Sequence, residues 1–68
     1  MAENEILEVL RRCVVGKTIV RLTSHGNTFT GKVHRLESRG VDSDLVIDKG
    51  NDDLQGFWFR QIENIEIV

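Results

Sequence analysis

The stretch Ile19–Val33, which reads I-V-R-L-T-S-H-G-N-T-F-T-G-K-V, decides the fold that the sequence predicts. Apolar and polar residues alternate on both sides of a polar cluster, Ser24–Asn27, as in a β-hairpin with one face in water. Gly26 and Asn27 tolerate the positive φ that a tight turn demands. Gly31 interrupts the apolar row, which indicates a sharp bend or a close approach of another backbone segment. Strongly bent strands of this kind close small barrels.

The length and composition of the chain limit what it can be. Its 68 residues make one small domain, residues 1–68, and a domain of this size buries only about 60% of its unfolded surface. The single cysteine, Cys13, excludes an intrachain disulfide, so oligomerisation is the most available reinforcement. The net charge of −2 gives no overall attraction for nucleic acid. With no signal peptide and no membrane-spanning run, we expect a cytoplasmic protein that does not contact a membrane.

One helix and five short strands are predicted around this hairpin. Four apolar residues share one face of a helix over about 3–13: Ile6, Val9, Leu10 and Cys13. The predicted strands cover about 17–23, 28–37, 43–48, 54–60 and 64–68. The spacing of Val33 and Leu36 breaks the alternation, which indicates a bulge or bend between them. Such strands favour a small closed or partly open barrel, and a four-stranded sheet crossed by a helix is the alternative.

Two groups of residues resemble known sequence motifs. The first is Val20, Leu22, Gly26, Phe29, Gly31 and Val33, with Glu37 six residues after Gly31. The second is Phe59 and Arg60, followed by Asn64, Ile65 and Ile67. On these residues the chain resembles the Sm and Sm-like family, which includes bacterial Hfq. The resemblance implies a mainly β fold: a short N-terminal α-helix, then five strongly bent antiparallel strands in a small SH3-like barrel. It also implies a homo-oligomeric ring, which we expect to hold about five to seven protomers.

The positions that contact RNA in the family match less well than those that form its barrel. The family's RNA-contacting Asn is Val41 here, and the position two residues before it, often a base-stacking residue, is Arg39. The glycine that follows the motif arginine is replaced by Gln61. The resemblance therefore favours ring assembly more strongly than RNA binding.

The resemblance predicts a site for single-stranded RNA at the pore of the ring. Its residues are Glu37, Arg39, Arg60 and Gln61. Arg60 could hold a phosphate or stack on a base, or it could lie at the surface and pair with Glu37 or Glu63. Arg39 could offer a stacking plane or be a solvated loop residue.

The aromatic run Phe57-Trp58-Phe59 leaves one side chain unexplained. The two-residue period of a strand sends Phe57 and Phe59 to the core face and Trp58 to the other. Trp58 could lie under the helix, in a subunit interface or on a base-stacking surface, and interfaces favour tryptophan.

No pattern in the chain indicates catalysis, a metal or a cofactor. His25, His34 and Cys13 lack the spacing of metal ligands. The acidic middle does not follow the calcium-loop spacing; its members are Asp42, Asp44, Asp48, Asp52 and Asp53. We therefore predict that the protein is not an enzyme. The alternative to RNA binding is a structural or protein-interaction β-barrel module that oligomerises without binding RNA.

Overall fold

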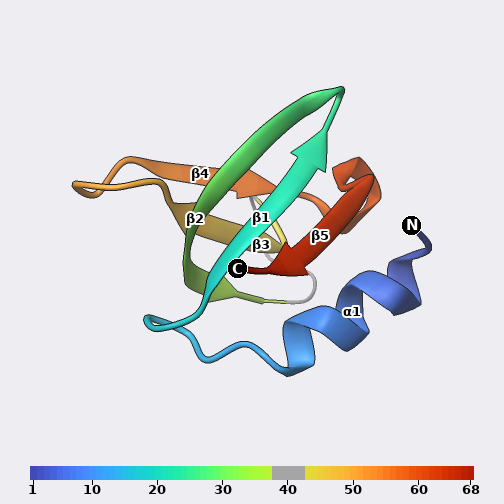
Figure 1. The fold of residues 1–68 in the computed structure, drawn as a ribbon, viewed down its shortest axis with the longest axis horizontal. Coiled ribbons are helices and arrows are strands. Elements are labelled where there is room, and N and C mark those ends of the chain that lie inside the picture. Colours follow the sequence, from blue (N-terminus) through green and yellow to red (C-terminus); the bar gives the residue numbers. More distant parts are fainter. Residues whose placement is uncertain (38–42) are drawn as a thin grey trace.

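The structure, a computed structural model, describes residues 1–37 and 43–68 and is mainly β in this part of the chain (Figure 1). In chain order the elements are α1 (Glu3–Arg11), β1 (Ile19–Ser24), β2 (Asn27–Leu36), β3 (Leu45–Asp48), β4 (Leu54–Phe57), the short 3-10 helix η1 (Phe59–Gln61) and β5 (Asn64–Ile67). The predicted succession of one helix and five strands is confirmed.

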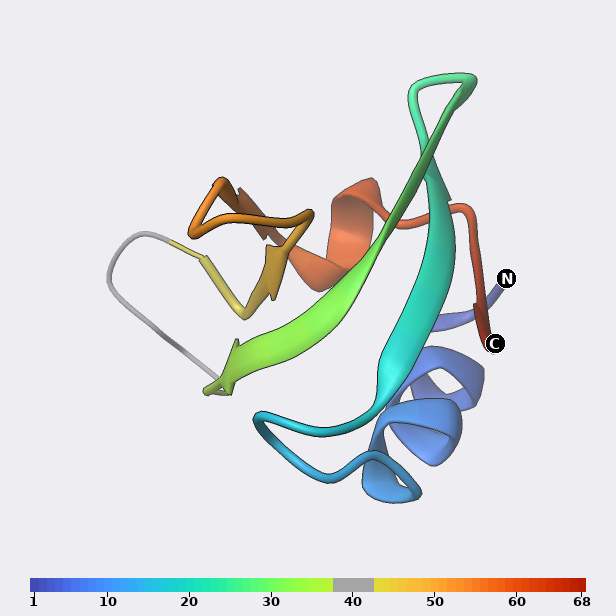
Figure 2. The same ribbon diagram turned by 60° about the vertical axis from the view of Figure 1, so that its left-hand side comes forward.

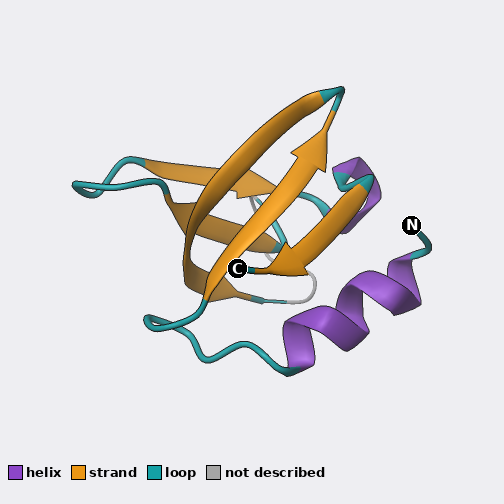
Figure 3. Cartoon of the chain, in the orientation of Figure 1, coloured by secondary structure: helices purple, strands orange, loops and turns teal. Residues whose placement is uncertain are grey.

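All neighbouring strands pair antiparallel, in the order β4-β3-β2-β1-β5. The long hairpin of β1 and β2 forms the centre, with β5 beside β1 and with β3 and β4 beyond β2 (Figures 2 and 3). Among the described residues β4 and β5 are not paired, so the sheet is open, and the closed form of the predicted closed or partly open barrel is not seen. The physical reason is that β4 and β5 span only four residues each, and η1 turns the chain between them.

Several predicted elements are too long at their ends. The helix ends at Arg11 rather than at residue 13, because the chain enters a turn in which the Thr18 hydroxyl accepts a hydrogen bond from the Val14 N–H at 2.7 Å. This turn also delays the first strand to Ile19. The predicted fourth strand, 54–60, ends at Phe57.

The turn of the central hairpin uses a different pair of residues from the predicted one. Ser24 pairs with Asn27, which leaves His25 and Gly26 as a two-residue loop. Their φ angles are 51° and 78°, so both central residues are left-handed, as a type I′ turn requires. Gly26 was predicted correctly, but the second left-handed residue is His25 and not Asn27.

At Gly31 the backbone of β2 comes very close to another strand, as predicted. A Cβ atom built on Gly31 would lie 2.6 Å from the carbonyl oxygen of Asp48, which is closer than van der Waals contact allows. The pairing of β2 with β3 also shifts register between Val33 and Arg35, which confirms the predicted irregularity before Leu36. Both features turn β2 so that it pairs with β1 along its first part and with β3 along its second.

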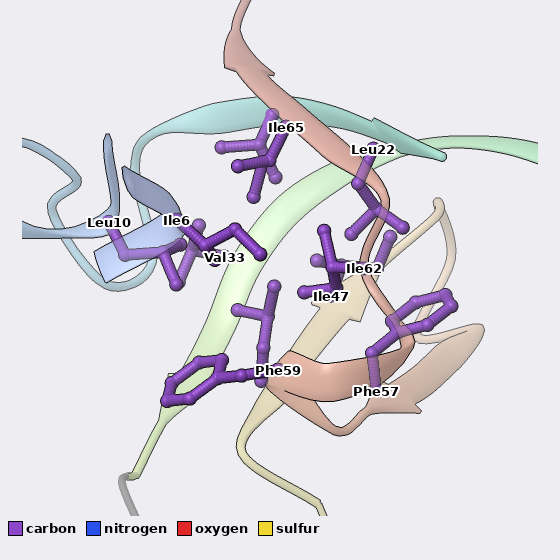
Figure 4. Packing of buried hydrophobic residues seen from close by; sticks show 11 residues of the cluster. Ile6, Leu10, Leu22, Val33, Ile47, Phe57, Phe59, Ile62 and Ile65 are labelled. Atoms are coloured by element: carbon purple, nitrogen blue, oxygen red, sulfur yellow. The ribbon is translucent and has the colours of Figure 1, made fainter. Parts of the chain in front are cut away.

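The core forms where α1 covers one end of the sheet. Ile6 and Leu10 reach from α1 toward the side chains of the strands (Figure 4). The buried cluster consists of Ile6, Leu10, Val20, Leu22, Val33, Leu45, Ile47, Phe57, Phe59, Ile62 and Ile65. α1 packs on β5 and η1, so the segment between residues 58 and 63 is held from one side by the helix.

Candidate functional site

The turn that carries Arg60 is held by hydrogen bonds from two of its backbone N–H groups to side chains. The backbone N–H of Phe59 donates to Oδ2 of Asp44 at 2.9 Å, and the backbone N–H of Trp58 donates to Oε1 of Gln61 at 2.9 Å. Phe59 is 4% exposed, and its side chain anchors the turn in the core. Because Phe59 points inward, its two neighbours are left at the surface.

These two neighbours contact each other. The guanidinium carbon of Arg60 lies 5.5 Å from the centre of the Trp58 ring, within the range of a cation–π interaction. Arg60 is exposed and Trp58 is partly buried. Arg60 forms no ion pair among the described residues. A planar cation is therefore held at the surface without a carboxylate that neutralises it in this part of the chain.

The two carboxylates considered as partners of Arg60 interact with other groups. Glu37 pairs with Arg35, with 3.5 Å between Oε2 and Nη1. Oε1 of Glu63 accepts a hydrogen bond at 3.0 Å from the N–H of Gly26, at the tip of the central hairpin. In the described residues, neither carboxylate makes the predicted surface pair with Arg60.

The four predicted site residues have different outcomes. Arg60 and Gln61 lie together on η1. Glu37 is linked to the same turn through its backbone, because its N–H donates to the carbonyl oxygen of Asp44 at 2.9 Å. The side chain of Asp44 holds η1, so the backbone of Glu37 and the backbone of η1 are bound to the same residue. Arg39 lies outside the described residues.

Two residues of this region were not assigned to the site from the sequence. Asp44 was assigned only to the acidic middle of the sequence, yet it accepts a hydrogen bond from the backbone of η1, 15 residues later. Trp58 was left between three roles, and the structure places it against Arg60. No local signal could have found the Asp44 contact, since it joins residues that are neighbours only in the folded chain.

A separate hollow of about 150 Å³ lies between the central hairpin and β4. Its described lining is polar and aromatic: Ser24, His25, Asn27, Phe29, Gln55, Gly56, Phe57 and Gln61. The Phe29 and Phe57 rings pack at 5.1 Å and are tilted by 59°. Among the described residues its walls carry no carboxylate, lysine or arginine side chain, so the hollow offers mainly hydrogen bonds and apolar contact.

The remaining reactive groups do not form a site in the described part of the chain. No group of three metal-ligating side chains occurs there. Burial raises the pKa of the Cys13 thiol, and the neighbouring Arg12 lowers it to a smaller extent. The thiol is therefore protonated at neutral pH and is a poor nucleophile.

Comparison with known proteins gives no relative. No protein-family model matches the chain, and neither the curated proteins nor the solved structures yield a match. The resemblance to the Sm-like family thus rests on the quoted residues alone and stays a prediction. None of the helices in residues 1–37 and 43–68 has the length and apolar character needed to cross a membrane.

Proposed function

We propose that this protein is an Sm-like, ring-forming protein that binds single-stranded RNA weakly through Arg60 of each protomer. The observation that carries the proposal is the exposed guanidinium of Arg60, held on a rigid turn without a carboxylate partner among the described residues. Arginine binds phosphates in a bidentate manner and stacks on bases, so such a group suits RNA.

The open edges of the sheet support the assembly part of the proposal. In the described residues the outer edges of β4 and β5 have no strand partner, and unpaired edges tend to associate. Both edges also expose apolar side chains: Leu54 on β4, Ile67 on β5 and Val68 directly after it. Pairing of β4 with β5 of the next protomer would cover these side chains and extend the sheet around a closed ring. A closed ring leaves no edge unpaired.

Repetition of the site explains how a chain with a net charge of −2 could bind RNA at all. One arginine contact is weak, but several protomers acting on the same strand raise the overall affinity through the high effective concentration. The acidic residues beside the site, including Glu37, do not attract phosphate. We therefore expect binding that is weak and falls steeply as salt rises.

Fluorescence anisotropy with a labelled oligouridine tests this function. Wild-type protein should bind at low salt, and Arg60→Ala should lose most of this binding. Arg21→Ala is a matched control, because Arg21 is also exposed but lies on β1 and pairs with Glu66 at 3.2 Å. If the wild type does not bind, or if Arg60→Ala binds as well as Arg21→Ala, the Arg60 site is wrong.

The second candidate is a structural or protein-interaction module of the same oligomeric fold without RNA binding. The negative net charge favours it, since an acidic surface repels a polyanion. This candidate gains if the protein assembles but binds no RNA at low salt.

A further inference from the structure

We infer that Trp58, covered by Arg60, is the base-stacking surface of the proposed RNA site, and that stacking on this pair makes the site prefer purines to pyrimidines. The inference rests on the proposed function and names which residue contacts the bases. It follows from the contact between the Arg60 guanidinium and the Trp58 ring, with 5.5 Å between guanidinium carbon and ring centre.

Trp58 does not serve the hydrophobic core. The core cluster and the partly buried side chains that pack against it include Phe57, Phe59 and Phe29, but not Trp58. A tryptophan ring is the largest apolar side chain, and leaving it outside a core this small forgoes considerable stabilisation. Its neighbour is instead the exposed guanidinium of Arg60, which a ligand can reach.

The turn holds the pair in place before any ligand arrives. The backbone N–H of Trp58 donates to the side chain of Gln61, and the next residue, Phe59, is buried and donates its backbone N–H to Asp44. Fixing the backbone on both sides of the ring lowers the entropy that binding would otherwise cost. Arg60 follows Trp58 by only two residues, and this short spacing keeps its guanidinium over the ring.

The pair offers two flat surfaces to a base. An indole face stacks on nucleobases, and a guanidinium plane does so as well. Stacking tolerates every base, and preferences then arise from stacking strength rather than from hydrogen bonds. Since a purine presents two fused rings, it overlaps the indole–guanidinium surface more fully than uracil does. The site should therefore bind oligoadenosine more tightly than oligouridine.

Trp58 is the only tryptophan of the chain, so its fluorescence reports on the site directly. Wild-type protein is titrated at low salt with oligoadenosine and oligouridine of equal length, reading indole emission and the anisotropy of labelled RNA together. We expect the emission to be quenched along the same binding curve, with the tighter curve for oligoadenosine. Unchanged emission at saturation, or oligouridine binding equally or more tightly, would overturn the inference.

Three variants separate stacking from charge. Trp58→Leu should weaken binding by about tenfold, as expected for the loss of base–aromatic stacking, whereas Trp58→Phe should retain most of it. Arg60→Lys keeps the charge but loses the plane, and should bind nearly as weakly as Arg60→Ala. The matched control is Phe29→Leu, which removes another partly buried ring that lies under a cation, with Lys49 Nζ 6.0 Å from the ring centre. It should leave RNA binding unchanged.

The outcomes distinguish this inference from the proposed function. If Arg60→Ala loses binding while folded Trp58→Leu binds like the wild type, Trp58 does not stack and the proposed function stands. If the wild type binds neither oligonucleotide at low salt, the proposed function fails and the inference with it. If Trp58→Leu does not fold, as judged by circular dichroism, the wild-type emission and Arg60→Lys decide the matter.

Discussion

At Gly31 the backbone of β2 passes so close to β3 that no side chain fits between them. A Cβ atom would meet the Asp48 carbonyl oxygen at 2.6 Å and its carbonyl carbon at 2.9 Å. Both neighbours are backbone atoms, so relief requires movement of a whole strand rather than of a flexible side chain. The bend of β2 and the pairing of β3 therefore depend on the absence of one methyl group.

We expect Gly31→Val to destabilise the protein by about 3 kcal/mol or more, because overpacking in a buried site already costs about 1–3 kcal/mol without backbone displacement. The measurement is urea unfolding followed by circular dichroism. Thr30→Val introduces the same side chain at the exposed neighbouring position and should leave the midpoint nearly unchanged. An unaltered midpoint for Gly31→Val would mean that β2 does not approach β3 at this residue.

At the residue scale, the sequence could predict that Gly31 lies at a bend or a close approach, but not which distant residues meet in the fold. Gly31 was recognisable because it broke an alternating row of apolar residues. The partner of Arg60 was not recognisable: the sequence offered Glu37 or Glu63, whereas the guanidinium lies beside the ring of Trp58. Only the path of the chain around η1 brings the guanidinium to the indole ring.

The central hairpin carries a residue that its turn does not favour. His25 has φ of 51°, in the left-handed region where asparagine and glycine are more comfortable than histidine. A non-glycine residue in this region costs about 1–3 kcal/mol, and Asn-Gly is the preferred pair for this turn type.

His25→Asn should therefore stabilise the protein by about 0.5–1 kcal/mol, a part of that strain. His34→Asn is the matched control, since His34 is the other histidine and occupies an exposed position in extended β2. It should give no stabilisation, because asparagine is disfavoured in strands. Thermal unfolding of the two variants compares them. Equal shifts for both would show that the turn conformation is not the cause.

The element that the sequence could not predict is η1. Phe57 and Phe59 are both buried, as the two-residue period predicts for a continuous strand, but the backbone between them leaves the sheet. The new direction is held by the carboxylate of Asp44, which directly precedes the neighbouring strand β3 and accepts a hydrogen bond from the Phe59 N–H. A local pattern of apolar residues fits either backbone, so a long-range hydrogen bond selects between them.

At the scale of the whole molecule, the open edges matter most for behaviour in solution. The order β4-β3-β2-β1-β5 and the antiparallel pairing agree with the predicted succession of strands, whereas closure of the sheet does not occur in the described residues. Whether the sheet closes could not be decided from the sequence, because closure depends on the lengths of β4 and β5. The ends of elements are the least certain feature of a sequence pattern. An open sheet with exposed Leu54 and Ile67 instead favours pairing between copies.

The backbone of Ile67 offers a precise test of such pairing. The N–H of Val68 donates to the carbonyl oxygen of Ile19, so residue 68 faces β1. Since successive N–H groups along a strand point to opposite edges, the N–H of Ile67 points to the open edge. Proline at position 67 removes this donor without removing a hydrogen bond to β1, and edge strands tolerate proline.

We expect light scattering of micromolar wild-type protein to give a mass of about five to seven chains, because only a closed ring covers every edge. Ile67→Pro should shift the protein to a folded monomer, since the donor needed for pairing with β4 of a neighbour is gone. Ile67→Ala is the matched control: it loses the same apolar side chain but keeps the N–H, so most of the assembly should remain. Circular dichroism establishes that both variants are folded. A monomeric wild type would exclude the ring, and loss of assembly in both variants alike would assign association to the side chain of Ile67 rather than to its strand edge.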